Sequence, residues 1–174
     1  MYLVSIYFDE KTNRRIQQYV DKVAEKTGNT FMLDGKVPPH ITVSAFETQN
    51  EEAVIEALGS LRHKLQKGNL TWVSVGQFFP YVIYMTPMLN AYLHEMAETI
   101  CHVLSDVEGV QVNTHYIPFQ WLPHTTIAKK LTKEQMQIAF EVLQNSFGVF
   151  EGEGVRIGLA KPNPHRDIAT WELR

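Results

Sequence analysis

The sequence is short of the features that mark several large classes of protein. Its 174 residues include one cysteine, Cys101, so no disulfide can form within the chain, and a reducing cytoplasm is the expected location. No apolar run approaches the roughly 18 residues of a membrane span. The apolar opening, residues 1–8, is too short for a signal sequence and is followed at once by Asp9 and Glu10. We therefore expect a cytoplasmic protein with no membrane association.

An excess of charge of one sign is also missing. The 16 Lys and Arg residues stand against 19 Asp and Glu residues, which gives a net charge of −3. This balance argues against a broad basic face for duplex nucleic acid, but it is compatible with a local basic pocket for one phosphate. The sequence has no Walker loop, no Gly-x-Ser-x-Gly turn and no Gly-rich dinucleotide loop. The usual interpretations as an NTPase, a hydrolase with a Gly-x-Ser-x-Gly nucleophile or a Rossmann protein therefore have no support, and no cofactor is expected.

What is present is a repeated order of predicted elements. Hydrophobic residues make up 44% of the chain and no Gly/Ser-rich linker divides it, which favours one domain over residues 1–174 with two lobes. Residues 1–79 and 80–174 each show the order strand, helix, loop, short strand, helix, strand, and the second half adds a final strand. This order does not decide between a parallel and an antiparallel sheet. Strands are expected at residues 2–8, 40–46, 70–79, 81–85, 124–128, 154–160 and 167–173.

Four start signals predict where the helices begin. In each helix, apolar residues three or four positions apart then form one buried face. The signals are Asp9 as an N-cap, the capping boxes of Thr48 with Glu51 and of Thr132 with Gln135, and Thr86 as an N-cap before Pro87.

Two of the short predicted strands contain the same motif, Pro-His-x-Thr followed by an apolar residue. Side chains two positions apart in a strand lie on the same face, so each motif places an imidazole beside a hydroxyl. The motifs occupy the same point in the two halves of the chain, and 84 positions separate their histidines. They are Pro39-His40-Ile41-Thr42 and Pro123-His124-Thr125-Thr126.

This pair of motifs suits the chemistry of a phosphodiester. Of His40 and His124, one as neutral imidazole can take a proton from an attacking oxygen, and the other as imidazolium can give one to the leaving oxygen. The hydroxyls of Thr42 and Thr126 can donate to the non-bridging oxygens, where charge develops. Neither a metal nor a nucleophilic Ser or Cys is required. The simpler interpretation of either motif alone is a structural histidine bonded to a neighbouring backbone group.

Paired His-x-Thr motifs at this separation, in a chain of this length, resemble the 2H phosphoesterase superfamily. Within it, the sequence is most similar to the bacterial 2′-5′ RNA ligase and cyclic phosphodiesterase branch. The resemblance implies an α+β fold of two pseudo-symmetric lobes, with antiparallel sheets and flanking helices around a central cleft. It implies that His40, Thr42, His124 and Thr126 face one another across that cleft. It also implies metal-free action on 2′,3′-cyclic phosphates or 2′-5′ linkages in RNA or nucleotides.

Residues near the second motif are candidates for substrate binding. Many members of the superfamily have Arg just after this motif, whereas this sequence has Lys129, which keeps the charge but loses the planar two-pronged contact. Trp121 can stack on a base or pack in the core. These features favour a small nucleotide or an RNA end over a long RNA. His165 and Arg166 follow two prolines and either approach the cleft or form a surface turn.

A metal site is not expected. His94, Glu98 and His102 recur every four residues along one helical face, which is a spacing that can bind a metal. The segment around His94 resembles a His-Glu-x-x-His zinc motif, but it lacks the second histidine. A polar, exposed helix face is the favoured interpretation.

The sequence thus predicts a metal-independent phosphoesterase, with hydrolysis of a cyclic phosphate or a 2′-5′ linkage favoured over ligation. The alternative from another class is a non-catalytic module that binds nucleotides or RNA in the same cleft. A monomer is favoured. The sequence leaves open which histidine is the acid, which is the base, and which substrate is natural.

Overall fold

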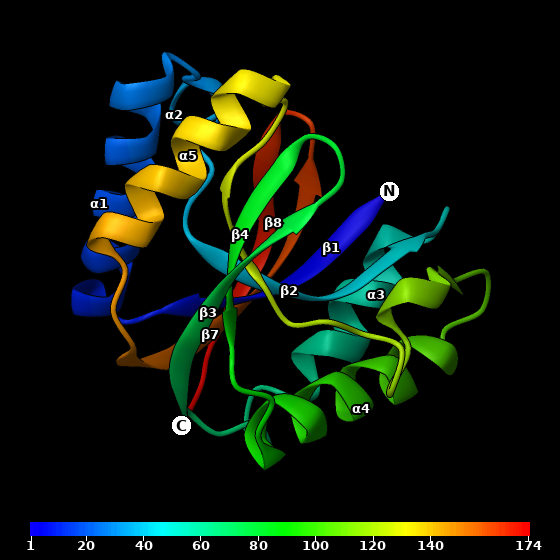
Figure 1. Cartoon of the computed structure of the whole chain (residues 1–174). Helices are drawn as coiled ribbons and strands as arrows, with labels where there is room; N and C mark the ends of the chain where they lie inside the picture. The colour runs from blue at the N-terminus through cyan, green and yellow to red at the C-terminus, as the bar shows by residue number, and fades with distance from the viewer.

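The computed structural model describes all 174 residues and shows one twisted sheet with helices on both sides (Figure 1). The helices are α1 (Glu10–Thr27), α2 (Phe31–Asp34), α3 (Glu51–Gly59), α4 (Ala91–Ser105) and α5 (Lys133–Ser146), with a 3₁₀ turn at Thr114–Tyr116. The strands are β1 (Tyr2–Phe8), β2 (His40–Glu47), β3 (Gly68–Phe78), β4 (Val82–Pro87), β5 (Gln111–Val112), β6 (Thr125–Ala128), β7 (Phe150–Pro162) and β8 (His165–Glu172).

Every strand pair in the sheet is antiparallel. The strand order is β5-β2-β1-β7-β3-β4-β6, and β8 pairs with β7. The long strand β7 joins the two parts of the sheet, because residues 150–154 pair with β3 whereas residues 154–160 pair with β1. The α+β class and the antiparallel sheet implied by the resemblance are confirmed. The short strand β5 is an addition that the sequence pattern did not indicate.

The helices pack in pairs that combine the two halves of the sequence. α1 contacts α5 on one side of the sheet, and α3 contacts α4 on the other (Figure 1). Each of these two pairs therefore combines one helix from residues 1–79 with one from residues 80–174. A connected core of 33 buried hydrophobic residues reaches from Ile16 of α1 to Ile100 of α4. Burial of this apolar surface is the main favourable term in folding and holds the two pairs to one sheet.

Two of the predicted helix starts are confirmed. The Asp9 carboxylate caps α1 by accepting from the backbone N–H groups of Lys11 and Thr12. The side chains and backbone of Thr132 and Gln135 form the expected capping box at α5.

The other two predicted starts are wrong. Asn50, not Thr48, caps α3, and its side chain accepts from the backbone of Ala53. β4 runs through Pro87, and α4 is capped by Asn90. Asparagine is as good an N-cap as threonine, and the Thr86 hydroxyl instead donates to a backbone carbonyl, so local signals did not separate the alternatives. None of the helices has the length and apolar character needed to cross a membrane.

Candidate active site

The two motif histidines lie at or just before the start of β2 and β6, and the partner strand of each carries a tyrosine. His40 is the first residue of β2 and lies opposite Tyr7 of β1. His124 directly precedes β6, where Thr126 lies opposite Tyr84 of β4. Each histidine thus has a tyrosine beside it, with ring centroids 6.3 Å apart for Tyr7 and His40 and 5.4 Å apart for Tyr84 and His124.

A glycine lies beneath each of these tyrosines. Gly158 of β7 faces the ring of Tyr7, and Gly76 of β3 faces the ring of Tyr84. A Cβ at either glycine would overlap the tyrosine ring, so the close approach requires the absence of a side chain. This repeated Gly–Tyr contact fixes the aromatic ring next to each motif histidine.

The proline in each motif helps to set the tautomer of the histidine that follows. Nδ1 of His40 lies 2.7 Å from the carbonyl oxygen of Pro38, and Nδ1 of His124 lies 2.9 Å from that of Leu122. A carbonyl only accepts, so Nδ1 is the protonated nitrogen in both neutral rings. The intervening proline restricts the backbone between the carbonyl and the ring. Nε2 of each ring, which has no hydrogen-bond partner in the protein, is left for proton transfer.

The histidines line two adjoining cavities that share Lys129. The first cavity, of about 590 Å³, is lined by His40, Lys129 and the side chain of His165. The second, of about 540 Å³, is lined by His124, Lys129 and Trp121. Lys129 therefore lies between the two motifs, where its charge can act on a group that bridges them.

Burial and nearby positive charge both act on the titration of this cluster. Protein surrounds most of the His40 ring, and this burial lowers its pKa to about 4, with further lowering by the charges of His165, Lys129 and His124 and an opposing effect of the Pro38 hydrogen bond. Burial lowers the pKa of His124 as well, with Lys129 as its one charged contributor. Burial also lowers the pKa of Lys129. Lys129 is therefore the basic side chain shared by two imidazoles whose burial favours their neutral forms, and its charge favours an anion at this place.

The two motif threonines differ in their surroundings. Thr42 is buried, with Oγ1 3.5 Å from the Ser5 hydroxyl, whereas Thr126 is partly exposed and lines the second cavity. The indole N–H of Trp121 donates to the Thr42 carbonyl at 2.9 Å. Trp121 thus does two things: it packs against the core cluster, and it ties the segment before the second motif to the first motif.

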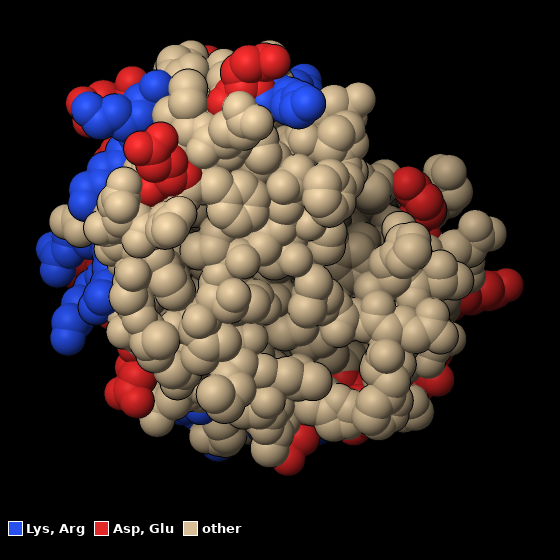
Figure 2. All heavy atoms as spheres, in the orientation of Figure 1, with Lys and Arg blue, Asp and Glu red and all other residues tan.

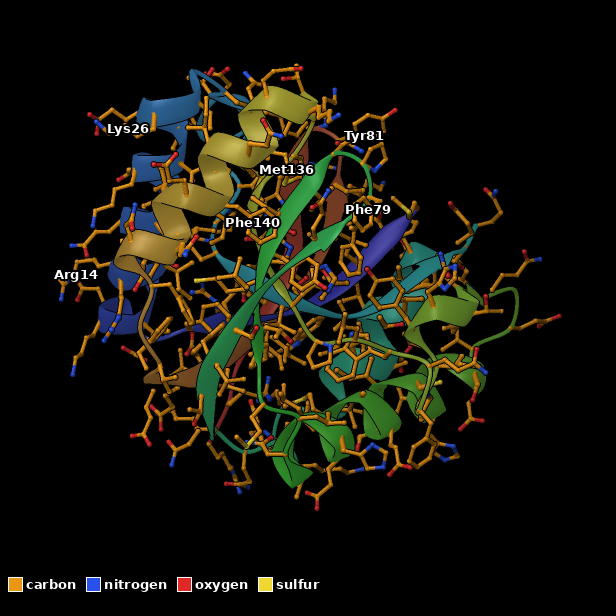
Figure 3. All side chains as sticks on the ribbon, viewed as in Figure 1. Arg14, Lys26, Phe79, Tyr81, Met136 and Phe140 are labelled. Carbon is orange, nitrogen blue, oxygen red and sulfur yellow. The ribbon has the colours of Figure 1, made fainter.

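Other surface features lie apart from this cluster. Figure 2 shows a face with few charged side chains at its centre and Lys and Arg along the edge near α1, where Arg14 and Lys26 point outward in Figure 3. A cavity of about 760 Å³ between the β3–β4 turn and α5 is lined by both polar and apolar side chains, and the apolar ones include Phe79 and Phe140 (Figure 3). It contains neither motif histidine.

The sequence matches the profile of the 2′-5′ RNA ligase superfamily over residues 9–165, a range that includes both motifs. The chain belongs to this superfamily. Its members are 2H phosphoesterases. Membership therefore supports an enzyme of this kind, with a role on phosphate esters of RNA or nucleotides. Among curated proteins, no sequence matches the chain.

Solved structures of other proteins have the same fold. LigT of E. coli, complexed with 3′-AMP, is 14% identical with a TM-score of 0.62, and the match covers 99% of this chain and 97% of LigT. TT0787 of Thermus thermophilus is 16% identical with a TM-score of 0.63, and the match again covers 99% and 97% of the two chains. Each structural match covers 99% of this chain, so the likeness in fold includes the helices and strands that surround the cavities.

The structure also brings His165 to the site. The sequence analysis gave two alternatives for this residue, a position near the cleft and a surface turn. It is the first residue of β8, and its ring lies 6.0 Å from that of His40 with an angle of 25° between the planes. Its side chain is only 8% exposed. No local pattern indicated this contact, because it depends on the pairing of β7 with β1 and on the hairpin that returns β8 along β7.

Proposed function

We propose that the protein is a metal-independent phosphoesterase that opens a 2′,3′-cyclic phosphate or cleaves a 2′-5′ phosphodiester at an RNA end or in a small nucleotide. One observation supports this above the others. His40 and His124 have the same tautomer and an unoccupied Nε2, and they line adjoining cavities on either side of Lys129. Two imidazoles beside one cation are the groups that a proton-coupled displacement at phosphorus requires.

In this reaction the oxygen of a water molecule forms a bond to phosphorus, and the bond from phosphorus to the 2′ or 3′ oxygen breaks. One neutral imidazole takes the proton of the water, and the other, as imidazolium, gives a proton to the leaving oxygen. The hydroxyls of Thr42 and Thr126 and the ammonium of Lys129 stabilise the charge on the non-bridging oxygens. After product release, exchange with solvent returns each imidazole to its starting form.

The second cavity supports a nucleoside substrate. It combines the His124 imidazole with the aromatic side chains of Phe78, Tyr116 and Trp121, against which a base can pack. The structural relative LigT has been solved with 3′-AMP and with ATP, so a cleft on this fold accommodates nucleotides. We infer that hydrolysis is the favoured direction, because water is in large excess over a second RNA end.

The test is a panel of 2′,3′-cyclic mononucleotides, RNA with a cyclic phosphate end, and 2′-5′ dinucleotides, assayed with excess EDTA. Wild-type turnover that is lost in His40→Gln and His124→Gln supports the proposal. His102→Gln, which changes a histidine that is 79% exposed on α4, is the matched control. Binding of these compounds without turnover would favour the non-catalytic alternative, and full activity in His40→Gln would contradict the proposed roles.

A further inference from the structure

The two motifs are alike in their own residues but differ in the rings that surround them. His124 contacts Phe78 edge-to-face, with ring centroids 4.8 Å apart, and Tyr84 at 5.4 Å. His40 has Tyr7 at 6.3 Å and, in place of a second neutral aromatic ring, the imidazole of His165 at 6.0 Å. A third imidazole therefore packs against the first motif histidine, whereas His115, which lines the second cavity, makes no ring contact with His124.

His165 is held in this place by groups from two other positions in the sheet. Its Nε2 lies 3.4 Å from the hydroxyl of Tyr7 and 3.6 Å from a carboxylate oxygen of Asp167. The Tyr7 hydroxyl donates to the same oxygen of Asp167 at 2.5 Å, and burial together with this bond raises the pKa of Tyr7, so the phenol stays protonated. β1 and β8 thus fix the third imidazole against the first motif.

We propose that His165 is a positioning residue that extends the neutral range of the His40 imidazole to lower pH, and that it thereby favours His40 as the general base and His124 as the general acid. This inference rests on the proposed function, because it assigns roles within that reaction. It adds an assignment that the two motifs alone leave undecided.

The physical basis is repulsion between like charges in a cavity that solvent reaches only in part. Two cations about 6 Å apart repel each other, so a positive charge on the His165 ring disfavours a proton on the His40 ring. Among the charged groups that lower the pKa of His40, His165 is the largest contributor, ahead of Lys129 and His124. His124 has Lys129 as its one charged contributor, so its imidazolium form is opposed less.

The other charged groups around the cluster do not reverse this difference, in which nearby positive charge opposes protonation of His40 more than that of His124. From β7, the Arg156 guanidinium lies over the Tyr7 ring at 5.2 Å and adds positive charge. Lys130 and Asp34 also line the first cavity, with Lys130 over the Phe31 ring at 4.4 Å, and neither contributes to the lowered pKa of His40. Asp167 is the carboxylate in direct contact with the cluster, and it bonds to Tyr7 and His165 rather than to His40.

The roles follow from these protonation states. Neutral His40 accepts at Nε2 the proton of the attacking water as its oxygen bonds to phosphorus. Protonated His124 donates from Nε2 to the leaving oxygen as the bond from phosphorus to that oxygen breaks. One proton enters the pair and one leaves it, so the step balances without a metal or a co-reactant.

The test compares His165→Gln with wild type, with His102→Gln as a control of the same chemical change at an exposed site remote from the cluster. Removal of a neighbouring positive charge raises the pKa of His40, so the base becomes protonated at higher pH. The acidic limb of kcat/KM for a 2′,3′-cyclic mononucleotide should therefore move upward by about one pH unit. The rate at the pH optimum should stay within about tenfold, because neither reacting group is removed.

A second measurement is independent of turnover. Titration of the histidine ring signals by NMR, with His40 assigned by its absence in His40→Gln, should show the same upward movement in His165→Gln. If His165→Gln does not fold, His165→Phe supplies the first motif with the kind of neighbour that Phe78 gives the second, and the same movement is expected.

The outcomes are distinguishable. An unmoved acidic limb and an unmoved His40 titration in a folded variant would overturn the role of His165. A uniform loss of rate at every pH, without movement of the limb, would reduce His165 to a packing residue and also overturn it. If wild type turns over none of the substrates, the proposed function fails, and the NMR titration alone decides whether His165 keeps His40 neutral.

Discussion

Replacement of His40 by glutamine should make the protein more resistant to acid than wild type, even though it removes a proposed catalytic group. Burial and neighbouring charge lower the pKa of His40 in the folded protein to about 4, against about 6.5 in the unfolded chain. Between these values the unfolded chain binds a proton at this site and the folded protein does not. The free energy of unfolding therefore falls as the pH decreases from 6.5 towards 4, and His40→Gln removes this contribution.

The magnitude follows from the two values. Each pH unit within the window is worth about 1.4 kcal/mol, so at pH 4.5 the folded protein has lost about 2.5 kcal/mol through this one residue. The loss is nearly absent at pH 7.5, where His40 is neutral in both states. The variant also loses the contact with the Pro38 carbonyl. This loss does not depend on pH, so it adds a constant offset to the difference in unfolding free energy between the variant and wild type.

The assay is urea unfolding followed by tryptophan fluorescence at several pH values from 7.5 to 4.5, in buffers without phosphate or sulfate, because an anion in the site would raise the pKa of His40. The quantity of interest is the difference in unfolding free energy between wild type and His40→Gln. This difference should change by about 2.5 kcal/mol in favour of the variant, whereas His102→Gln should stay parallel to wild type. Parallel curves for His40→Gln would refute the argument that His40 is kept neutral by the folded structure.

Four further outcomes are expected. His40→Ala and His124→Ala should each lower kcat by about 10²–10⁴, and the double variant should lose less than the product of the two, as measured by initial rates on the best substrate of the panel. Activity should survive excess EDTA; loss on chelation that Zn²⁺ or Mn²⁺ restores would show that the histidines are metal ligands. Lys129→Met, which keeps the stem and removes the charge shared by both cavities, should weaken binding of a phosphate-containing inhibitor by at least about tenfold in calorimetry, with unchanged affinity as the contrary result. Gly158→Ala should destabilise the fold by about 1–3 kcal/mol in urea unfolding because the added methyl displaces the ring of Tyr7, and an unchanged midpoint would contradict the packing described.

The parts of the site that are local in sequence could be predicted, and those that depend on the pairing of distant strands could not. Period-two alternation places His40 and Thr42 on one face of a strand, and the same holds at the second motif. The N-cap of α4 was misassigned because Thr86 and Asn90 offer the same chemistry four residues apart. His165 is beyond any local pattern, because its approach to His40 needs three strand pairings at once.

The hydrogen bond between Tyr7 of β1 and Asp167 of β8 also has a consequence for the order in which the two motifs mature during synthesis. The aromatic neighbours of the second motif, Phe78 and Tyr84, precede it in sequence, so its surroundings are available as soon as β6 has emerged. The first motif waits longer, because Tyr7 bonds to Asp167 across 160 positions. A ribosome-bound chain that lacks β8 therefore has both motif histidines without the third imidazole. The complete electrostatic environment of His40 arises only when β8, which is synthesised long after β1, has reached the Tyr7 side chain.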